Sequence, residues 1–193
     1  MNGATGGTGP CIGLIELASI AAGYEATDAL VKEAEVEVLE SGPVTPGKFF
    51  VLFTGPVEEV TSALRRGLET GADVVLDQLF IPNVEPTLLQ LARTGSLPSQ
   101  PLDALGIIET LSIASTIRAA DIASKTASLR LVSLRLAAGI GGKSFVTFTG
   151  EVSDVESGLE RGSADAEQAG MLVRRVAIPR PHRAMRAVLG LEP

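Results

Sequence analysis

The pattern of hydrophobic and polar positions predicts an α+β fold. It begins with an almost continuous apolar run, which follows the Gly/Thr-rich residues 1–10. Such a run predicts a buried strand, and Ser19 after it can cap a helix that ends near Glu35. A second amphipathic helix is predicted after Gly55. The strands around these helices are predicted over Cys11–Leu17, Glu37–Val44, Lys48–Thr54 and Val74–Ile81.

The second half of the chain repeats the first. The stretch GLIELASIAAGYEATDALVKEAEV from Gly13 recurs as GIIETLSIASTIRAADIASKTASL from Gly106, 93 positions later. The stretch GKFFVLFTG from Gly47 recurs as GKSFVTFTG from Gly142, 95 positions later, which predicts a two-residue insertion in the loop between the blocks. Strands are therefore also predicted over Leu129–Ala138, Lys143–Thr149 and Met171–Ile178, with Ser112 capping a helix.

Each half then consists of β-α-β-β-α-β and a short terminal helix, with two helices on one face of a four-stranded, mainly antiparallel sheet. This is a ferredoxin-like sandwich. Between the halves, the Pro/Ser/Gly-rich stretch TGSLPSQPLD predicts a linker, with the boundary near Gln100. We expect a disordered tail over residues 1–10, a first domain over 11–100 and a second over 101–193.

Charge and hydropathy exclude several classes of function. The chain has 16 basic and 23 acidic residues, a formal net charge of −7, and no run of Lys or Arg. Neither a nucleic-acid-binding protein nor a polybasic membrane anchor is expected from this balance. No apolar stretch approaches the roughly 18 to 20 residues that a membrane span needs, and the amino end lacks the features of a signal peptide, so a cytoplasmic location is expected.

Reactive side chains are scarce. Cys11 is the single cysteine and His182 the single histidine, which excludes an intrachain disulfide and most Cys/His metal or catalytic sites. Next to Pro181, His182 is expected to be a surface or capping residue. We find no nucleophile, base or metal cluster, so the sequence predicts a protein that is not an enzyme and that has no metal site.

The repeated residues resemble the shell proteins of bacterial microcompartments. The resemblance lies in GLIE and GIIE, in DALVKEA and DIASKTA, in the glycine-lysine pair before the third strand of each half, and in IPRPH. The order of the blocks is that of the non-permuted, tandem-domain trimer class. This resemblance implies a pseudohexameric homotrimer in the shell, which assembles with other shell proteins of the same microcompartment and carries a central pore for small metabolites.

Within that class the chain resembles the propanediol-utilisation trimer that holds an iron–sulfur cluster at its pore. In that relative a cysteine precedes the PGK of the first-domain loop, whereas this chain has Thr45 there. A hydroxyl does not replace a thiolate as a ligand of iron–sulfur clusters. Cys11 is far from the loop in sequence. We therefore expect no cluster and no other cofactor.

By the same resemblance, the first-domain loop converges on the threefold axis and the second-domain loop, Gly139–Gly142, lies off it. A small uncharged ring at the axis favours the passage of polar uncharged molecules. The pore candidates are Gly42, Pro43, Val44, Thr45 and Pro46.

The resemblance also implies residues at the tile edge. Lys32 and Lys125 each lie four residues after an aspartate, and such a pair on a helix is otherwise a solvated surface pair worth a few tenths of a kcal/mol. In the family these lysines lie against the same residue of a neighbouring tile. Arg180 of IPRPH reaches over the edge in the family, and Asn83 takes its place in the first half, so the two edges should differ.

Two other classes of function remain open at this point. Duplicated ferredoxin-like domains also form soluble trimeric regulatory proteins that bind small molecules at subunit interfaces. An enzyme without Cys or His chemistry is the third class. It would need a convergent polar pocket, which the sequence does not locate. Flat hexagonal arrays would distinguish a shell protein from the regulatory class.

Overall fold

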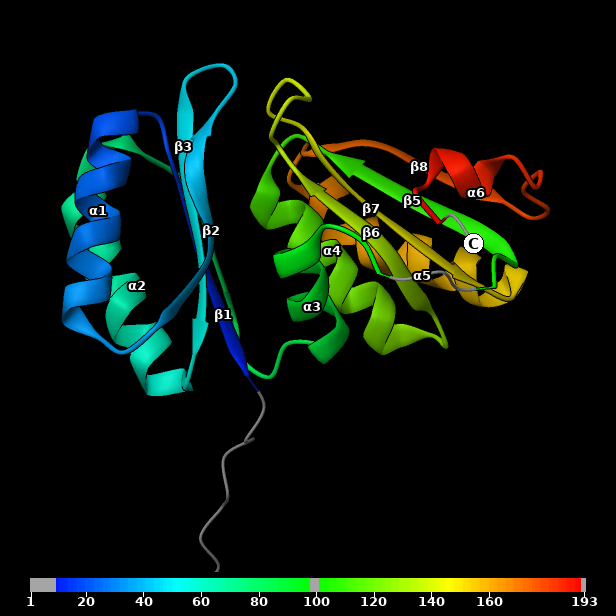
Figure 1. The fold of residues 1–193 in the computed structure, drawn as a ribbon, viewed down its shortest axis with the longest axis horizontal. Helices are drawn as coiled ribbons and strands as arrows, with labels where there is room; N and C mark the ends of the chain where they lie inside the picture. The colour runs from blue at the N-terminus through cyan, green and yellow to red at the C-terminus, as the bar shows by residue number, and fades with distance from the viewer. Residues whose placement is uncertain (1–9, 98–100, 192–193) are drawn as a thin grey trace, which may run out of the picture. The chain divides into compact units, whose positions relative to one another are not determined.

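The computed structural model describes residues 10–97 and 101–191. Contacts divide the chain into two compact units, Met1–Pro86 and Thr87–Pro193 (Figure 1). The tail expected over residues 1–10 lies outside the described residues except for Pro10, and so does the boundary expected near Gln100.

The first unit is one four-stranded antiparallel sheet with the order β2-β3-β1-β4, covered on one face by two helices. Its elements are β1 (Cys11–Leu17), α1 (Ile20–Glu33), β2 (Glu37–Val44), β3 (Lys48–Gly55), α2 (Val57–Gly71), a 3₁₀ turn (Ala72–Val74) and β4 (Val75–Ile81).

The second unit has the same topology, with the sheet order β6-β7-β5-β8. A helix, α3 (Pro86–Thr94), leads into it from the first unit. The other elements are β5 (Ala104–Thr110), α4 (Ile113–Thr126), β6 (Arg130–Leu136), β7 (Ser144–Gly150), α5 (Val152–Gln168), β8 (Leu172–Ile178) and α6 (Met185–Val188).

The duplicated ferredoxin-like α+β fold predicted from the sequence is confirmed, and the strands expected from the pattern end within two residues of the observed ones. The repeat extends to irregularities of the backbone. The register shift between Val38 and Glu40 in β2 recurs between Leu131 and Ser133 in β6. Because a bulge bends and twists its strand, both sheets are shaped in the same way.

Capping and close packing position the helices. The Ser19 and Ser112 hydroxyls accept hydrogen bonds from the backbone N–H groups of Ala22 and Ser115, as predicted for N-caps. On α2, a Cβ at Gly67 would lie 2.5 Å from the Ile15 side chain, so this glycine lets the helix lie directly on the sheet. The core of the first unit lies between the two helices and the sheet.

A short segment after α3 adds to the second sheet. Ser96 forms an antiparallel bridge with Ser133 of β6, Leu97 donates its N–H to the Val132 carbonyl at 3.0 Å, and Leu134 donates to the Gly95 carbonyl at 2.9 Å. We call Gly95–Leu97 the linker arm. It covers the outer edge of β6 with a strand-like contact.

Candidate functional site

The predicted pore residues lie at the tip of the β2–β3 hairpin. The strand pairing ends at Val44 and Lys48, and the Gly47 N–H donates to the Val44 carbonyl at 2.9 Å. The Thr45–Pro46 peptide bond is cis, and Gly47 has a φ of +107°, which glycine tolerates best. The result is a three-residue connection that places Thr45 and Pro46 at an exposed tip.

The second hairpin is longer, as the two-residue shift of the repeat predicted. Strands β6 and β7 end their pairing at Leu136 and Ser144, and three glycines between them have positive φ. The inserted residues therefore lie in the loop, while the strands keep their register. The first unit carries the compact, proline-containing loop and the second unit the glycine-rich one.

The hairpin tip does not fit an iron–sulfur cluster. Thr45 provides a hydroxyl, and the chain's single cysteine lies on β1 opposite Gly55, at the end of the sheet far from the loop, since Leu17 pairs with Phe49 beside the tip. Seven strand residues separate the two ends by about 20 Å. Among the described residues, no three His, Cys, Asp or Glu side chains gather as a metal site would require.

Cys11 itself is a buried structural residue. It has no exposed surface, and burial raises the pKa of its thiol to about 11, with a hydrogen bond from the Ile12 backbone acting in the opposite direction. A neutral thiol is a poor nucleophile and a poor metal ligand. Cys11 therefore belongs to the core of the first unit.

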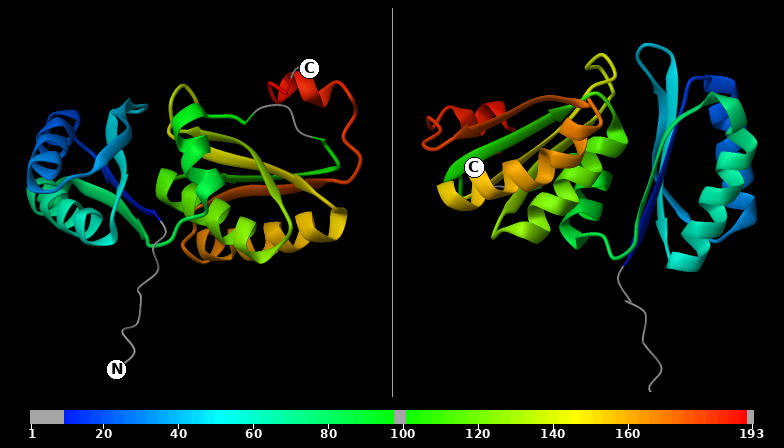
Figure 2. Two further views of the ribbon diagram at one scale, coloured as in Figure 1. Left: turned by 60° about the horizontal axis from the view of Figure 1, so that its bottom comes forward. Right: turned by 180° about the vertical axis from the view of Figure 1, so that it is seen from behind.

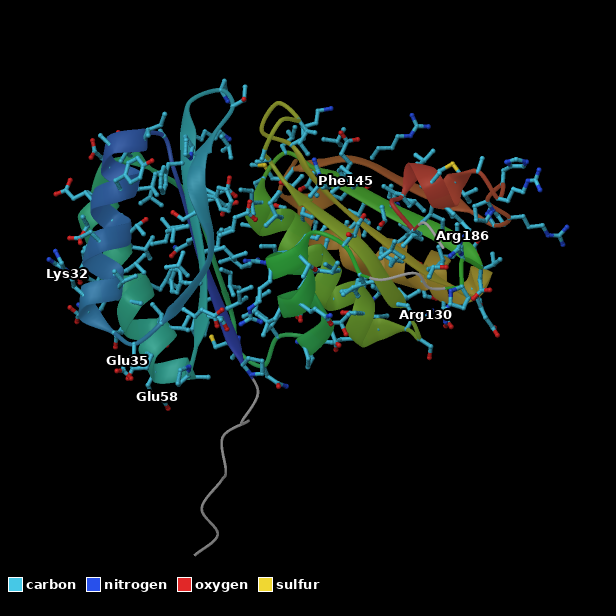
Figure 3. All side chains as sticks on the ribbon, in the orientation of Figure 1. Lys32, Glu35, Glu58, Arg130, Phe145 and Arg186 are labelled. Atoms are coloured by element: carbon cyan, nitrogen blue, oxygen red, sulfur yellow. The ribbon has the colours of Figure 1, made fainter. Side chains whose placement is uncertain are left out.

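The predicted edge lysines both form the expected i,i+4 ion pairs, but in different surroundings. Lys32 pairs with Asp28, and both side chains are largely exposed, at 73% and 62%. Lys32 projects from α1 away from the sheet (Figure 3). Lys125 lies 2.8 Å from Asp121, whose side chain is only 8% exposed. The two lysines thus occupy equivalent places on α1 and α4, and the second is held against a more buried carboxylate.

The other two predicted edge residues follow the last strand of each sheet. Asn83 is exposed with a φ of +54°, a conformation that asparagine adopts more readily than most residues. Arg180 is exposed between two prolines and borders a shallow depression with Asp103 and Glu151. The first unit therefore has a neutral side chain where the second has a cation.

His182 has the capping role expected for it. Its Nδ1 accepts a hydrogen bond from the backbone N–H of Ala184 at 3.2 Å, just before α6.

The segment around His182 is basic. It contains five arginines between Arg174 and Arg186 and no acidic residue between Met171 and Leu191. Apart from the adjacent Arg174 and Arg175, these arginines are separated in sequence, so a search for longer Lys/Arg runs misses the segment, whereas the local net charge reveals it.

No helix in the described residues has the length and apolar character needed to cross a membrane. The two hairpins and the edge residues described above belong to two domains that match a known family. The BMC domain matches residues 11–84 and again residues 104–181, so one copy covers each sheet with its two helices.

Similar proteins have the same domain organisation. The bacterial microcompartment shell protein PduT from Citrobacter freundii is 41% identical over 174 residues, which are 90% of this chain and 94% of that protein. The crystal structure of a microcompartment protein from Desulfitobacterium hafniense superimposes with a TM-score of 0.87 at 48% identity, covering 93% of this chain and 99% of that chain.

A shorter relative matches one domain. The bacterial microcompartment shell protein EutM from Salmonella typhimurium is 35% identical over 81 residues, which are 42% of this chain and 82% of that protein. The chain therefore contains two domains of the size of EutM, and with both domains matched it belongs to the BMC-domain family of microcompartment shell proteins.

Proposed function

We propose that this protein is a structural component of a bacterial microcompartment shell and that three copies assemble into a pseudohexameric ring. The observation that carries this proposal is the duplication, because each half of the chain is a complete BMC domain with the same strand order and the same bulges. Three chains supply six such domains. Heterologous contacts of this kind close into a ring when the rotation between domains closes.

In this proposal the β2–β3 hairpins of the three copies surround the central axis and line a pore for small metabolites. The loop has no charged residue between Ser41 and Gly47, and its tip exposes the Thr45 hydroxyl and the proline rings. Selectivity of a pore depends on its width and on the groups that line it. Such a ring favours small polar molecules without net charge and holds no iron–sulfur cluster.

The rim of the ring makes the contacts with neighbouring tiles, whether copies of this chain or other shell proteins. Lys32 and Lys125 occupy equivalent exposed positions, as a repeated edge contact requires. Arg180 extends the edge of the second unit, and Asn83 leaves that of the first unit neutral. The function is thus one of assembly and permeability and not of catalysis.

A soluble trimeric regulatory protein is the competing function, and array formation distinguishes it. The purified protein should sediment at three times its chain mass of 19.9 kDa and form flat hexagonal sheets in electron micrographs. Lys32→Ala with Lys125→Ala should abolish the sheets and leave the trimer. Discrete trimers that never form sheets, alone or with other shell proteins, would favour the regulatory alternative.

The pore has its own test. In shells that enclose an enzyme, Thr45→Asp should slow the entry of an anionic substrate several-fold and leave that of an uncharged one within about twofold, because three added carboxylates would repel anions at the axis. The control is Ile140→Asp in the second hairpin loop, which this proposal places away from the axis. Equal entry of both substrates in Thr45→Asp shells would exclude Thr45 from the pore.

A further inference from the structure

The linker arm shows how this chain passes from one BMC domain to the next. After β4, the chain forms α3, ends that helix at Gly95 with a φ of +73°, and pairs Gly95–Leu97 with the edge strand β6 of the following unit. The arm thus leaves the domain that precedes it in sequence and extends the sheet of the domain that follows.

The carboxyl end of the chain repeats these features after the second domain. Following β8, it forms α6 and ends this helix at Gly190 with a φ of +69°. Gly190 donates to the Ala187 carbonyl and Leu191 to the Arg186 carbonyl, as in a helix that ends at a left-handed glycine. We call Gly190–Leu191 the terminal arm. Among the described residues, no strand pairing involves this arm.

The edge that would receive the terminal arm exists on the first unit. β2 ends the first sheet as β6 ends the second, and Ser41 pairs with Val51 as Leu134 pairs with Val146. The Leu134 N–H points outward, to the Gly95 carbonyl, so the equivalent Ser41 N–H points outward from β2. An edge strand is a template for pairing with another chain.

The connection to the terminal arm is long enough. From Ile81 to Gly95 the chain contains a nine-residue helix, and from Ile178 to Gly190 a helix of only four residues flanked by bends and turns. With a rise of 1.5 Å per helical residue and about 3.3 Å per non-helical residue once it is extended, both connections can span about 30 Å. The shorter helix compensates for the shorter sequence.

In the single chain, α6 and the terminal arm fold back on their own unit. α6 lies on the face of the second sheet opposite to α4 and α5 (Figure 2, left), and Leu191 is 1% exposed. Val188 of α6 remains 75% exposed. In domain exchange, a segment that packs on its own domain in the single chain packs on a neighbouring chain in the oligomer.

We propose that, in the ring, the terminal arm of each chain pairs with β2 of the next chain, as the linker arm pairs with β6 within a chain. The partner is a second copy of this protein, and the contact is an antiparallel strand addition with Leu191 opposite Glu40, as Ser96 is opposite Ser133. The ring then has six equivalent junctions, three within chains and three between them. This inference rests on the proposed trimer.

Disulfide trapping tests this contact. Ser96 and Ser133 form a non-hydrogen-bonded pair, in which Cα atoms are about 4.5 Å apart, a separation that permits a disulfide. In a Cys11→Ala background, Glu40→Cys and Leu191→Cys on separately tagged chains should form a mixed disulfide in more than half of the co-assembled trimers after mild oxidation. The doubly substituted chain should give covalent trimers on a non-reducing gel.

Matched pairs give the controls. Ser96→Cys with Ser133→Cys should oxidise within a chain and migrate as a monomer, and Leu191→Cys with Ser133→Cys should not cross-link, because the linker arm occupies β6. Intact trimers without the mixed disulfide would overturn the inference and leave the shell function in place. Failure of the unsubstituted protein to form trimers would instead contradict the proposed function itself.

Discussion

The two halves of this chain have one fold but fill the same part of the core differently. In the first unit, Phe49 of β3 lies against Gly23 of α1, and its ring is 5.0 Å from that of Tyr24 in a tilted arrangement. A Cβ at Gly23 would lie 2.1 Å from Cγ of Phe49. The aromatic ring therefore occupies the space that a side chain on the helix would need, beside the buried Leu17.

In the second unit three hydroxyl residues replace this apolar group, namely Thr110, Thr116 and Ser144. The Thr110 and Thr116 hydroxyls lie 2.6 Å apart, and Thr110 also donates to the Ser112 carbonyl. Ser144 accepts from the Ala137 N–H at 3.2 Å. Each buried hydroxyl has a partner, as burial requires.

The comparison shows that a large side chain on the strand can be replaced by a small one when the facing helix residue becomes larger, and the backbone stays the same. Where the strand carries Phe49, the helix has a glycine; where the strand carries Ser144, the helix has a threonine. The register of both sheets is the same. Such paired exchange is expected in a close-packed interior, where each side chain is matched to its neighbours.

Replacing Phe49 by the serine of the second unit should break the comparison most severely. Phe49→Ser leaves a cavity next to Gly23 and should lower the free energy of unfolding by about 3–5 kcal/mol, as large-to-small core substitutions do. Denaturant unfolding measures this loss. Its matched control is Ser144→Ala, which loses one hydrogen bond and should cost about 1–2 kcal/mol.

A double substitution then tests whether the two positions are coupled. Gly23→Thr alone overpacks against Phe49 and should cost about 1–3 kcal/mol. Combined with Phe49→Ser, it restores the pairing of the second unit, so the double variant should be more stable than the sum of the single effects by at least about 1 kcal/mol. Strict additivity would mean that the two side chains do not share this space.

Much of this architecture could be predicted from the sequence because it depends on local signals. The apolar run at Cys11–Leu17, the capping serines Ser19 and Ser112, and the i,i+4 pairs of Lys32 and Lys125 all involve neighbours within a few residues. The internal repeat added the long-range information, since a second copy of the same pattern must form the same sheet.

The linker arm could not be predicted in this way. Ser96 and Leu97 lie in the polar stretch TGSLPSQ, which has no strand periodicity, and their pairing depends on a β6 edge that lies more than 30 residues later in the sequence. A single bridge at a sheet edge leaves no hydrophobic pattern. The packing exchange between Gly23 and Phe49 was also hidden, because the two residues are 26 positions apart.

The pH dependence of stability should differ between the halves in alkaline solution, because the first unit has a buried thiol at Cys11 and the second has Ala104 in the same place. The folded pKa of about 11 lies above the ordinary thiol value of 9.0, so the neutral thiol contributes stability that is present below pH 9 and lost as the pH rises toward 11. At pH 10 the loss should be about 1.4 kcal/mol. Measured against Cys11→Ala from pH 7 to 10.5, a pH-independent difference would contradict the raised pKa.

The smallest expected difference separates the two edge ion pairs. Lys32→Ala should change the free energy of unfolding by only about 0.3 kcal/mol, because both partners are exposed. Lys125→Ala should cost about 1 kcal/mol, since it removes a partner of the mostly buried Asp121 carboxylate. Double-mutant cycles with Asp28→Asn and Asp121→Asn in low and high salt would measure both couplings, and salt should weaken the Lys32 pair more. Equal couplings in both units would mean that the burial of Asp121 does not strengthen its pair, and the two halves would then differ in their cores but not along their helix surfaces.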